Sequence, residues 1–330
     1  MVARTLRDGA EGGAVTERVA AIDCGTNSIR LLIADIDARG SVLTDIEREM
    51  RIVRLGEGVD RTGRLSEAAL SRTIAALREY ADRIEALSPA AVRMVATSAT
   101  RDAENSQEFV DRVKEVLGAS PEVVSGDEEA WLSFSGATRE LAGAALARQD
   151  GCAPPYLVTD IGGGSTEFVL GGPEGVSGAR SVDIGCVRMT ERHLHRDPPS
   201  RAEVAAATAD IDSALVTVAA SVPVEQGRTL VGLAGSVTTV AGIALGLKRY
   251  EATRIHHSRI TAAQVHEVTR QLLAQTRAER AAIGVMHPGR VDVIGAGALV
   301  LDRIIAHFGF AEVLVSEHDI LDGIAWSLVP

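Results

Sequence analysis

Two short segments of this 330-residue chain place a carboxylate directly before a turn rich in glycine and hydroxyl side chains, DCGTNS from Asp23 and DIGGGS from Asp160. Glycines let backbone amides approach phosphate oxygens, hydroxyls add donors, and an aspartate can hold a divalent cation. A single turn of this kind is more often an ordinary hairpin. Two of them in one chain favour a site that binds phosphate and metal.

The surroundings of the two turns repeat at an offset of 160 − 23 = 137 residues. Apolar runs flank each turn and predict strand, turn, strand. Neither turn has the Gly-Lys-Ser/Thr ending of a P-loop or the helix that follows the turn of a dinucleotide site. Two similar lobes would therefore each present a phosphate-facing turn.

The elements that must position these turns can be predicted from pattern. A hairpin begins at Arg18, a third strand follows from Ser41, and Ser66 is expected to cap a helix that runs to about Leu87. Further strands are expected at Val92, at 121–125, at 230–234 and at 313–315, with TSATRDAENS as a polar connection. Helices are expected from Gly126, Cys186, Arg201, Ser236, Thr261 and Val291.

Strands grouped at the start of each half and then mixed with helices predict an α/β protein of two lobes. We place lobe I at residues 1–132, with 1–17 disordered, and lobe II at residues 133–330. The C-terminal helix is expected to pack back on lobe I.

Composition narrows the class of protein. Hydrophobic residues make up 46% of the chain and charged residues 24%, as in a globular protein. No apolar run approaches the roughly 20 residues of a membrane span, and residues 1–18 do not resemble a signal peptide. Three cysteines without metal-like spacing favour a reducing cytoplasm. A net charge of −11 with 3% aromatic residues argues against nucleic acid as a partner.

Six segments of the chain resemble one known family in the same order. They are AIDCGTNSIRLLIAD from Ala21, ATSATRDAEN from Ala96, SGDEEA from Ser125, DIGGGSTE from Asp160, DIGCVRMTE from Asp183 and LAGSVTTVA from Leu233. The family is that of exopolyphosphatases and guanosine pentaphosphate phosphohydrolases, Ppx/GppA, in the superfamily of actin, sugar kinases and Hsp70. The resemblance implies two actin-like (ribonuclease H-like) lobes with a cleft between them.

The resemblance also assigns site residues one by one. It places the first phosphate loop on Asp23, Gly25, Thr26, Asn27 and Ser28, and the second on Asp160, Gly162, Gly163, Gly164, Ser165, Thr166 and Glu167. Thr26 stands where the family has serine and keeps the hydroxyl. Arg101 falls on the family's phosphate-facing arginine, and Glu129 falls on its catalytic glutamate.

The chemistry of the residue types agrees with this assignment. Hydrolysis of a phosphoanhydride needs a positioned water and neutralisation of the phosphoryl charge. Glu129 could deprotonate that water, although acidic residues such as Glu128 are common in a first helical turn because of the helix dipole. The metal candidates are Asp160, Glu167 and Asp23, with Mg²⁺ or Mn²⁺ as the cation.

For two further positions, a purely structural interpretation competes equally with a role in phosphate binding. Arg30 is a candidate second guanidinium near the first loop, or a solvated hairpin arginine. Gly235 and Ser236 are a third candidate for anion binding, or a plain strand-to-helix turn.

The histidines are interpreted as surface or loop residues. For the pairs His193/His195 and His256/His257, no Cys, Glu or further His in the sequence completes a ligand set. Longer family members carry an additional C-terminal domain that resembles the HD phosphohydrolases, and this chain is expected to have no room for one. The dipeptide His318-Asp319 is therefore interpreted as a coincidental match to the HD motif. The segment SEHDILDG replaces the family's Arg-Glu-Gly, so a phosphate contact from that region is not expected.

Four functions remain open at this point. The leading hypothesis is an exopolyphosphatase that releases terminal orthophosphate, with a preference for short chains. Guanosine pentaphosphate is the alternative substrate for the same reaction. A nucleotide-binding kinase and a sensor with little turnover are the other classes. A homodimer is expected from the resemblance and from the abundance of symmetric dimers.

Overall fold

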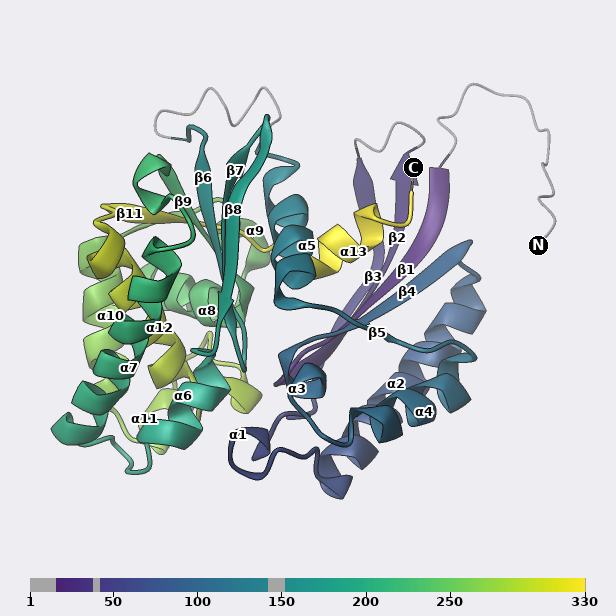
Figure 1. Cartoon of the computed structure of the whole chain (residues 1–330), viewed down its shortest axis with the longest axis horizontal. Coiled ribbons are helices and arrows are strands. Elements are labelled where there is room, and N and C mark those ends of the chain that lie inside the picture. The colour runs from purple at the N-terminus through teal and green to yellow at the C-terminus, as the bar shows by residue number, and fades with distance from the viewer. Residues whose placement is uncertain (1–15, 38–41, 142–151, 330) are drawn as a thin grey trace.

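The computed structural model describes residues 16–37, 42–141 and 152–329. Most of the predicted disordered segment 1–17 lies outside these residues, while Thr16 and Glu17 already belong to the first strand. Two mixed sheets with helices on their faces form two lobes side by side (Figure 1). The predicted α/β fold with two lobes is confirmed.

The first sheet has five strands in the order β3-β2-β1-β4-β5. Their bounds are β1 Thr16–Cys24, β2 Ser28–Asp37, β3 Leu43–Ile52, β4 Ala91–Ala96 and β5 Glu122–Val123. β1 pairs antiparallel with β2 and parallel with β4.

The second sheet has six strands in the order β10-β11-β9-β6-β7-β8. Their bounds are β6 Tyr156–Ile161, β7 Thr166–Gly172, β8 Gly175–Val182, β9 Thr229–Leu233, β10 Arg259–Thr261 and β11 Glu312–Val315. β6 pairs antiparallel with β7 and parallel with β9, so the pairing around β6 repeats the pairing around β1. Asp23 near the end of β1 and Asp160 near the end of β6 therefore occupy equivalent places.

Helices cover both faces of each sheet. Those of the first half are α1 Val59–Thr62, α2 Glu67–Leu87, α3 Ser98–Arg101, α4 Ser106–Leu117 and α5 Gly126–Thr138. Those of the second half are α6 Cys186–His193, α7 Arg201–Ala219, α8 Ala234–Ala244, α9 Ala252–Ile255, α10 Ala262–Ala274, α11 Arg277–Ala281, α12 Ile294–Phe308 and α13 Ile320–Trp326.

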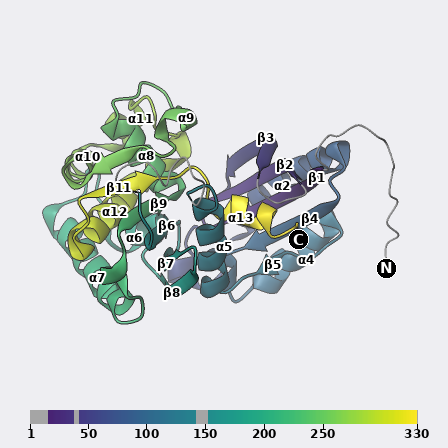
Figure 2. The same ribbon diagram turned by 90° about the horizontal axis from the view of Figure 1, so that it is seen from above.

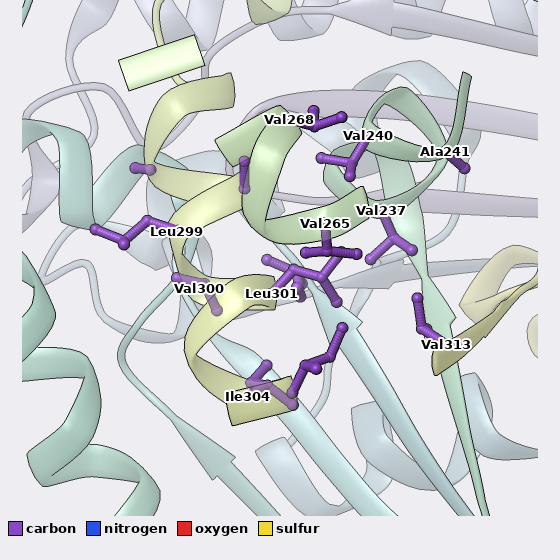
Figure 3. Close-up of a cluster of buried hydrophobic side chains, with 14 of the residues drawn as sticks. Val237, Val240, Ala241, Val265, Val268, Leu299, Val300, Leu301, Ile304 and Val313 are labelled. Atoms are coloured by element: carbon purple, nitrogen blue, oxygen red, sulfur yellow. The ribbon is translucent and has the colours of Figure 1, made fainter. Parts of the chain in front are cut away.

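Successive strand residues point to opposite faces, and each face has its own core. In the first lobe, Ile22 packs with α2 and α4 on one face, and Ala21 packs with α13 on the other. In the second lobe, Leu157 belongs to the large core around α7, α8, α10 and α12, and Val158 packs with α5 on the opposite face. Figure 3 shows side chains of α8, α10 and α12 meeting in that large core.

Two helices each pack on the lobe opposite to the one whose strands precede them in the sequence, and together they join the lobes. α5 follows the first sheet in sequence but packs on β7 and β8, whereas α13 ends the second half and packs on β1 and β2. They cross in close contact (Figures 1 and 2). A Cβ at Gly136 would lie 1.9 Å from the carbonyl oxygen of Asp319, and one at Gly323 would lie 2.0 Å from that of Leu132, so both positions require glycine. The predicted boundary at residue 132 falls inside α5.

Most sequence expectations match the elements, with local differences. Ser66 caps α2 as predicted by accepting from the amide of Ala69. The expected strand at 121–125 is reduced to two residues, and the connection expected at TSATRDAENS contains the short helix α3. The strand β8 was not expected. No helix in the described ranges is long and apolar enough to cross a membrane.

Candidate active site

The two glycine-rich turns meet face to face where the lobes join. A Cβ at Gly163 would lie 2.8 Å from Cβ of Thr26, and a Cβ at Gly164 would lie 2.6 Å from Oγ of Ser98. Oγ of Ser98 also forms a 3.0 Å hydrogen bond with Oγ1 of Thr26. The second loop needs its glycines because the first loop leaves no room for side chains there.

An arginine of the second lobe holds this contact together. Arg188 of α6 donates through Nε to the carbonyl oxygen of Gly164 at 2.8 Å and through Nη1 to Asp60 at 2.6 Å. It also donates to Asp102, the neighbour of Arg101. Because Asp60 and Asp102 belong to the first lobe, this guanidinium bridges the two lobes beside the loops.

A cavity of about 90 Å³ lies between the turns. Thirteen of the predicted site residues line it, namely Asp23, Gly25, Thr26, Asn27, Ser28, Arg30, Glu129, Asp160, Gly162, Gly163, Ser165, Gly235 and Ser236. The fold therefore gathers the first loop, most of the second loop, the predicted base and the start of α8 around one small polar space.

Four predicted residues do not line this cavity. Arg101 donates to Oε2 of Glu129 and to the carbonyl oxygen of Val124, each at 3.0 Å. Glu167 is buried and accepts from Ser181 at 2.7 Å. Thr166 donates to a backbone carbonyl, and Gly164 packs against the first loop. In this structure Arg101 holds the predicted base instead of facing the space between the loops.

Burial and mutual repulsion perturb the carboxylates of the cluster. Burial raises the pKa of Glu129 to about 7, against the lowering effect of Arg101 and with a smaller contribution from Asp160. Burial likewise raises the pKa of Asp160 to about 7, although Ser133 donates to it at 2.7 Å. Burial followed by repulsion from Glu129 and Asp160 raises the pKa of Glu167 strongly.

The raised pKa values of these carboxylates bear on whether the site is suited to a divalent cation. Three buried carboxylates whose pKa values are raised by burial, with repulsion from Asp160 adding to the effect at Glu129 and Glu167, would be relieved by a divalent ion, and oxygen donors are what Mg²⁺ and Mn²⁺ prefer. Asp160, which lines the cavity, therefore fits the predicted role, whereas Glu167 shares the buried charge but does not line the cavity. Asp23 differs because Arg30 forms an ion pair with it at 2.6 Å, which lowers its pKa against the larger raising effect of burial.

The predicted ligands do not form a compact three-ligand cage. Within the described ranges, the group of three residues whose ligand atoms all lie within 4.8 Å of one another is Glu140, His256 and His318, away from the loops. Mg²⁺ usually combines one or two carboxylates with waters and substrate phosphates, so a cage is not required. The same observation corrects the expectation for His256, because the fold supplies the glutamate and second histidine that its sequence neighbours lack.

Arg30 is held between two carboxylates. Besides Asp23 it donates to Asp319, which accepts from the amide of Leu321 at the start of α13. The side chain of Arg30 is 21% exposed, so it is not a solvated hairpin arginine. The SEHDILDG segment thus supplies a carboxylate that pairs with Arg30.

Sequence reasoning missed Arg290. It lines the cavity, and no ion pair joins it to a carboxylate in the described part of the chain. Its Nη1 lies 3.3 Å from the carbonyl oxygen of Gly235, and a Cβ at that glycine would lie 2.1 Å from Cζ of Arg290. Burial lowers its pKa. No local motif marks this arginine, since 55 residues separate it from its contact.

Comparison with known proteins places this geometry in a family. The family model described as "Ppx/GppA phosphatase family" matches residues 32–330. The chain belongs to this family. It is 50% identical over 323 residues to exopolyphosphatase 2 of Mycobacterium tuberculosis, covering 94% of this chain and 98% of that protein. It is also 30% identical to the guanosine-5′-triphosphate,3′-diphosphate pyrophosphatase of Aeromonas salmonicida, covering 94% of this chain and 59% of that protein.

Solved structures of Ppx/GppA proteins share the fold. An exopolyphosphatase from Cytophaga hutchinsonii superposes with a TM-score of 0.81 at 26% identity, covering 95% of this chain and 99% of the other. The Ppx/GppA enzyme of Aquifex aeolicus superposes with a TM-score of 0.77 at 31% identity, covering 95% and 100%. The expected family and its two-lobed architecture are both confirmed.

Proposed function

We propose that this Ppx/GppA protein is an exopolyphosphatase that hydrolyses the terminal phosphoanhydride of inorganic polyphosphate. One observation carries the proposal: Glu129, with a pKa of about 7, lines a small cavity formed by two glycine-rich loops in contact. A base with a pKa near the working pH is suited to accept a proton from water. The 50% identity to exopolyphosphatase 2 supports the choice of substrate.

The loops supply the binding of the terminal phosphate. Asn27, Gly162 and Gly163 line the cavity, and their backbone amides or the Asn27 side chain can donate to phosphate oxygens. The start of α8 adds the free amides of a helix N-terminus at Gly235. A phosphate held from both lobes would be oriented for in-line attack.

Glu129 would act on the attacking water. As the water oxygen bonds to phosphorus, its proton passes to a carboxylate oxygen of Glu129, and the bond from phosphorus to the bridging oxygen breaks. The electron pair leaves with the shortened chain, and orthophosphate remains between the loops. Arg101 is a positioning residue here, because its hydrogen bonds to Glu129 and Val124 fix the carboxylate.

Asp160 would hold Mg²⁺ or Mn²⁺, and Glu167 would add its buried charge. The cation would supply positive charge for phosphate oxygens that otherwise face an acidic site and a chain of net charge −11. Ser133 and Ser181 orient the two carboxylates through hydrogen bonds of 2.7 Å each. We further propose a cytoplasmic homodimer with no nucleic acid or membrane partner.

Guanosine pentaphosphate is the second candidate substrate, and a larger cavity favours it specifically. This cavity of about 450 Å³ shares Arg30, Gly235 and Arg290 with the small one. Its other side is lined by Tyr250, Val285 and Met286 among others, which suits a nucleoside. A nucleotide with its terminal phosphate between the loops could place its base there.

Phosphate release measured side by side tests the proposal. Polyphosphates of defined length, guanosine pentaphosphate and ATP would each be supplied with Mg²⁺ and, separately, with EDTA. We expect the highest kcat/KM with polyphosphate, and loss of activity in EDTA. Faster release from guanosine pentaphosphate would transfer the assignment to the second candidate, and binding without turnover of any substrate would favour a sensor.

A further inference from the structure

A cluster of Glu140, His256 and His318 lies where three separate segments of the chain come together. Glu140 follows the last turn of α5, His256 ends α9, and His318 lies between β11 and α13. The connection from β11 to α13 passes from the second lobe to the first and runs beside α5 in Figure 1. A ligand bound here would tie the end of α5 and the connection before α13 to the end of α9.

The distances in this cluster match a tetrahedral metal site. Oε2 of Glu140 lies 3.3 Å from Nε2 of His256 and 3.4 Å from Nδ1 of His318, and all three ligand atoms lie within 4.8 Å of one another. In a tetrahedral Zn²⁺ site with bonds of about 2.0–2.1 Å, neighbouring ligand atoms are about 3.3 Å apart. Two imidazoles and one carboxylate favour Zn²⁺ over Mg²⁺.

The three side chains of the cluster remain accessible to solvent. The three side chains are between 22% and 48% exposed, so a hydrated ion can reach them. Glu140 is ionised because hydrogen bonding from His256 and then the nearby histidines lower its pKa, despite partial burial. His257 stacks on His256 with ring centroids 3.6 Å apart.

One hydrogen bond must change when a metal binds. The backbone N–H of Glu317 donates to Nδ1 of His256 at 3.1 Å, so the neutral ring carries its proton on Nε2, facing Glu140. Ligation through Nε2 transfers that proton to Nδ1, which can then no longer accept from Glu317. The loop at residues 316–318 would have to move.

That loop also forms part of the larger cavity. Ser316 and Glu317 line it, and the carboxylate of Glu317 accepts from the hydroxyl of Tyr250 at 2.6 Å. A displaced Glu317 would alter this contact and therefore the wall on which a nucleoside would rest. The link from the cluster to the cavity is a single turn of backbone.

We propose that Glu140, His256 and His318 form a Zn²⁺-type transition-metal site, separate from the catalytic cation site, whose occupancy shifts the loop at residues 316–318. The site does not depend on the hydrolase activity.

Metal binding can be measured directly with Co²⁺ as a spectroscopic substitute for Zn²⁺, in excess Mg²⁺ to occupy the cleft. We expect one equivalent per chain, with the absorption of a tetrahedral site, that Zn²⁺ displaces. His318→Gln and His256→Gln should each weaken binding at least tenfold, and circular dichroism would verify that both variants fold.

Two control variants separate this site from others. His266→Gln removes a histidine that faces a carboxylate elsewhere, 3.3 Å from Asp302, and should leave binding unchanged. Asp160→Asn disables the cleft and should also leave it unchanged. No binding in the wild type, equal binding by His318→Gln, or loss of binding in Asp160→Asn would each overturn the proposal.

Discussion

Replacing Asp160 by asparagine should stabilise the protein in the absence of cations while it abolishes the response to Mg²⁺. The carboxylate is buried, and burial together with repulsion from Asp319 raises its pKa from 3.8 to about 7. The substitution keeps the shape and leaves an oxygen that can accept from Ser133. Only the charge is removed.

The magnitude follows from the two pKa values. A carboxyl group whose pKa is raised on folding contributes its full stability below the unfolded value and loses it as pH rises through the folded value. The interval from 3.8 to about 7, at about 1.4 kcal/mol for each pH unit, gives a cost of about 4 kcal/mol at pH 8. The coupled carboxylates Glu129 and Glu167 take up part of this, so 4 kcal/mol is an upper figure.

Thermal unfolding at pH 5 and pH 8, in EDTA and in Mg²⁺, measures the effect. At about 2 °C for each kcal/mol, Asp160→Asn should melt on the order of 8 °C higher than the wild type at pH 8 in EDTA. The difference should shrink at pH 5, where the wild-type carboxyl binds a proton. Mg²⁺ should raise the melting temperature of the wild type and leave the variant unchanged.

Asp35→Asn is the matched control. Hydrogen bonding from Arg18 lowers the pKa of Asp35, so its ionised form favours folding above the unfolded pKa and the variant should melt slightly lower at pH 8. If Asp160→Asn melts at or below the wild-type temperature in EDTA at pH 8, the carboxylate is not under strain. The argument for a cation at this position would then fail.

Four other outcomes are expected. Glu129→Gln should lower kcat by roughly 10²–10⁴-fold with polyphosphate still bound, whereas Glu128→Gln, on the exposed side of α5, should lose much less. Because Glu129 must be ionised to act, kcat/KM should rise with pH up to about 7, and a flat profile from pH 5 to 8 would contradict its role. Short polyphosphates should be cleaved distributively with intermediates visible on gels, since a net charge of −11 repels phosphates outside the cleft; disappearance of long chains without intermediates would refute this. Light scattering should give twice the mass of 34.7 kDa at micromolar concentration, and a monomer would count against the dimer.

Local pattern was sufficient where neighbours in sequence decide the structure. The strand, turn, strand repeat predicted two equivalent hairpins, and β1–β2 and β6–β7 pair in this way. Ser66 and Thr261 marked the starts of α2 and α10 because an N-cap bonds only to the next turn of its own helix. β8 escaped prediction because its exposed residues and glycines give it no apolar alternation.

Local pattern failed where a role depends on a distant partner. Arg290 acquires its place from Gly235, and Asp319 acquires its place from Arg30, 289 residues earlier. The cluster at His256 could not be anticipated, since Glu140 lies 116 residues before it and His318 follows β11, a later strand of the second sheet. Sequence spacing says nothing about such contacts.

By itself, the sequence pattern determined the two loops and the fold class, because glycines, carboxylates and hydrophobic periodicity act through neighbouring backbone, whereas the choice of Glu129 as candidate base came from the family resemblance. Only the tertiary structure decided the state of these groups. Arg30 forms an ion pair with Asp23 but leaves Asp160 and Glu167 buried without a cationic partner in the described residues, and Arg101 holds Glu129. A pKa depends on burial and on charges within a few ångströms, and the crossing of α5 and α13 is what sets both.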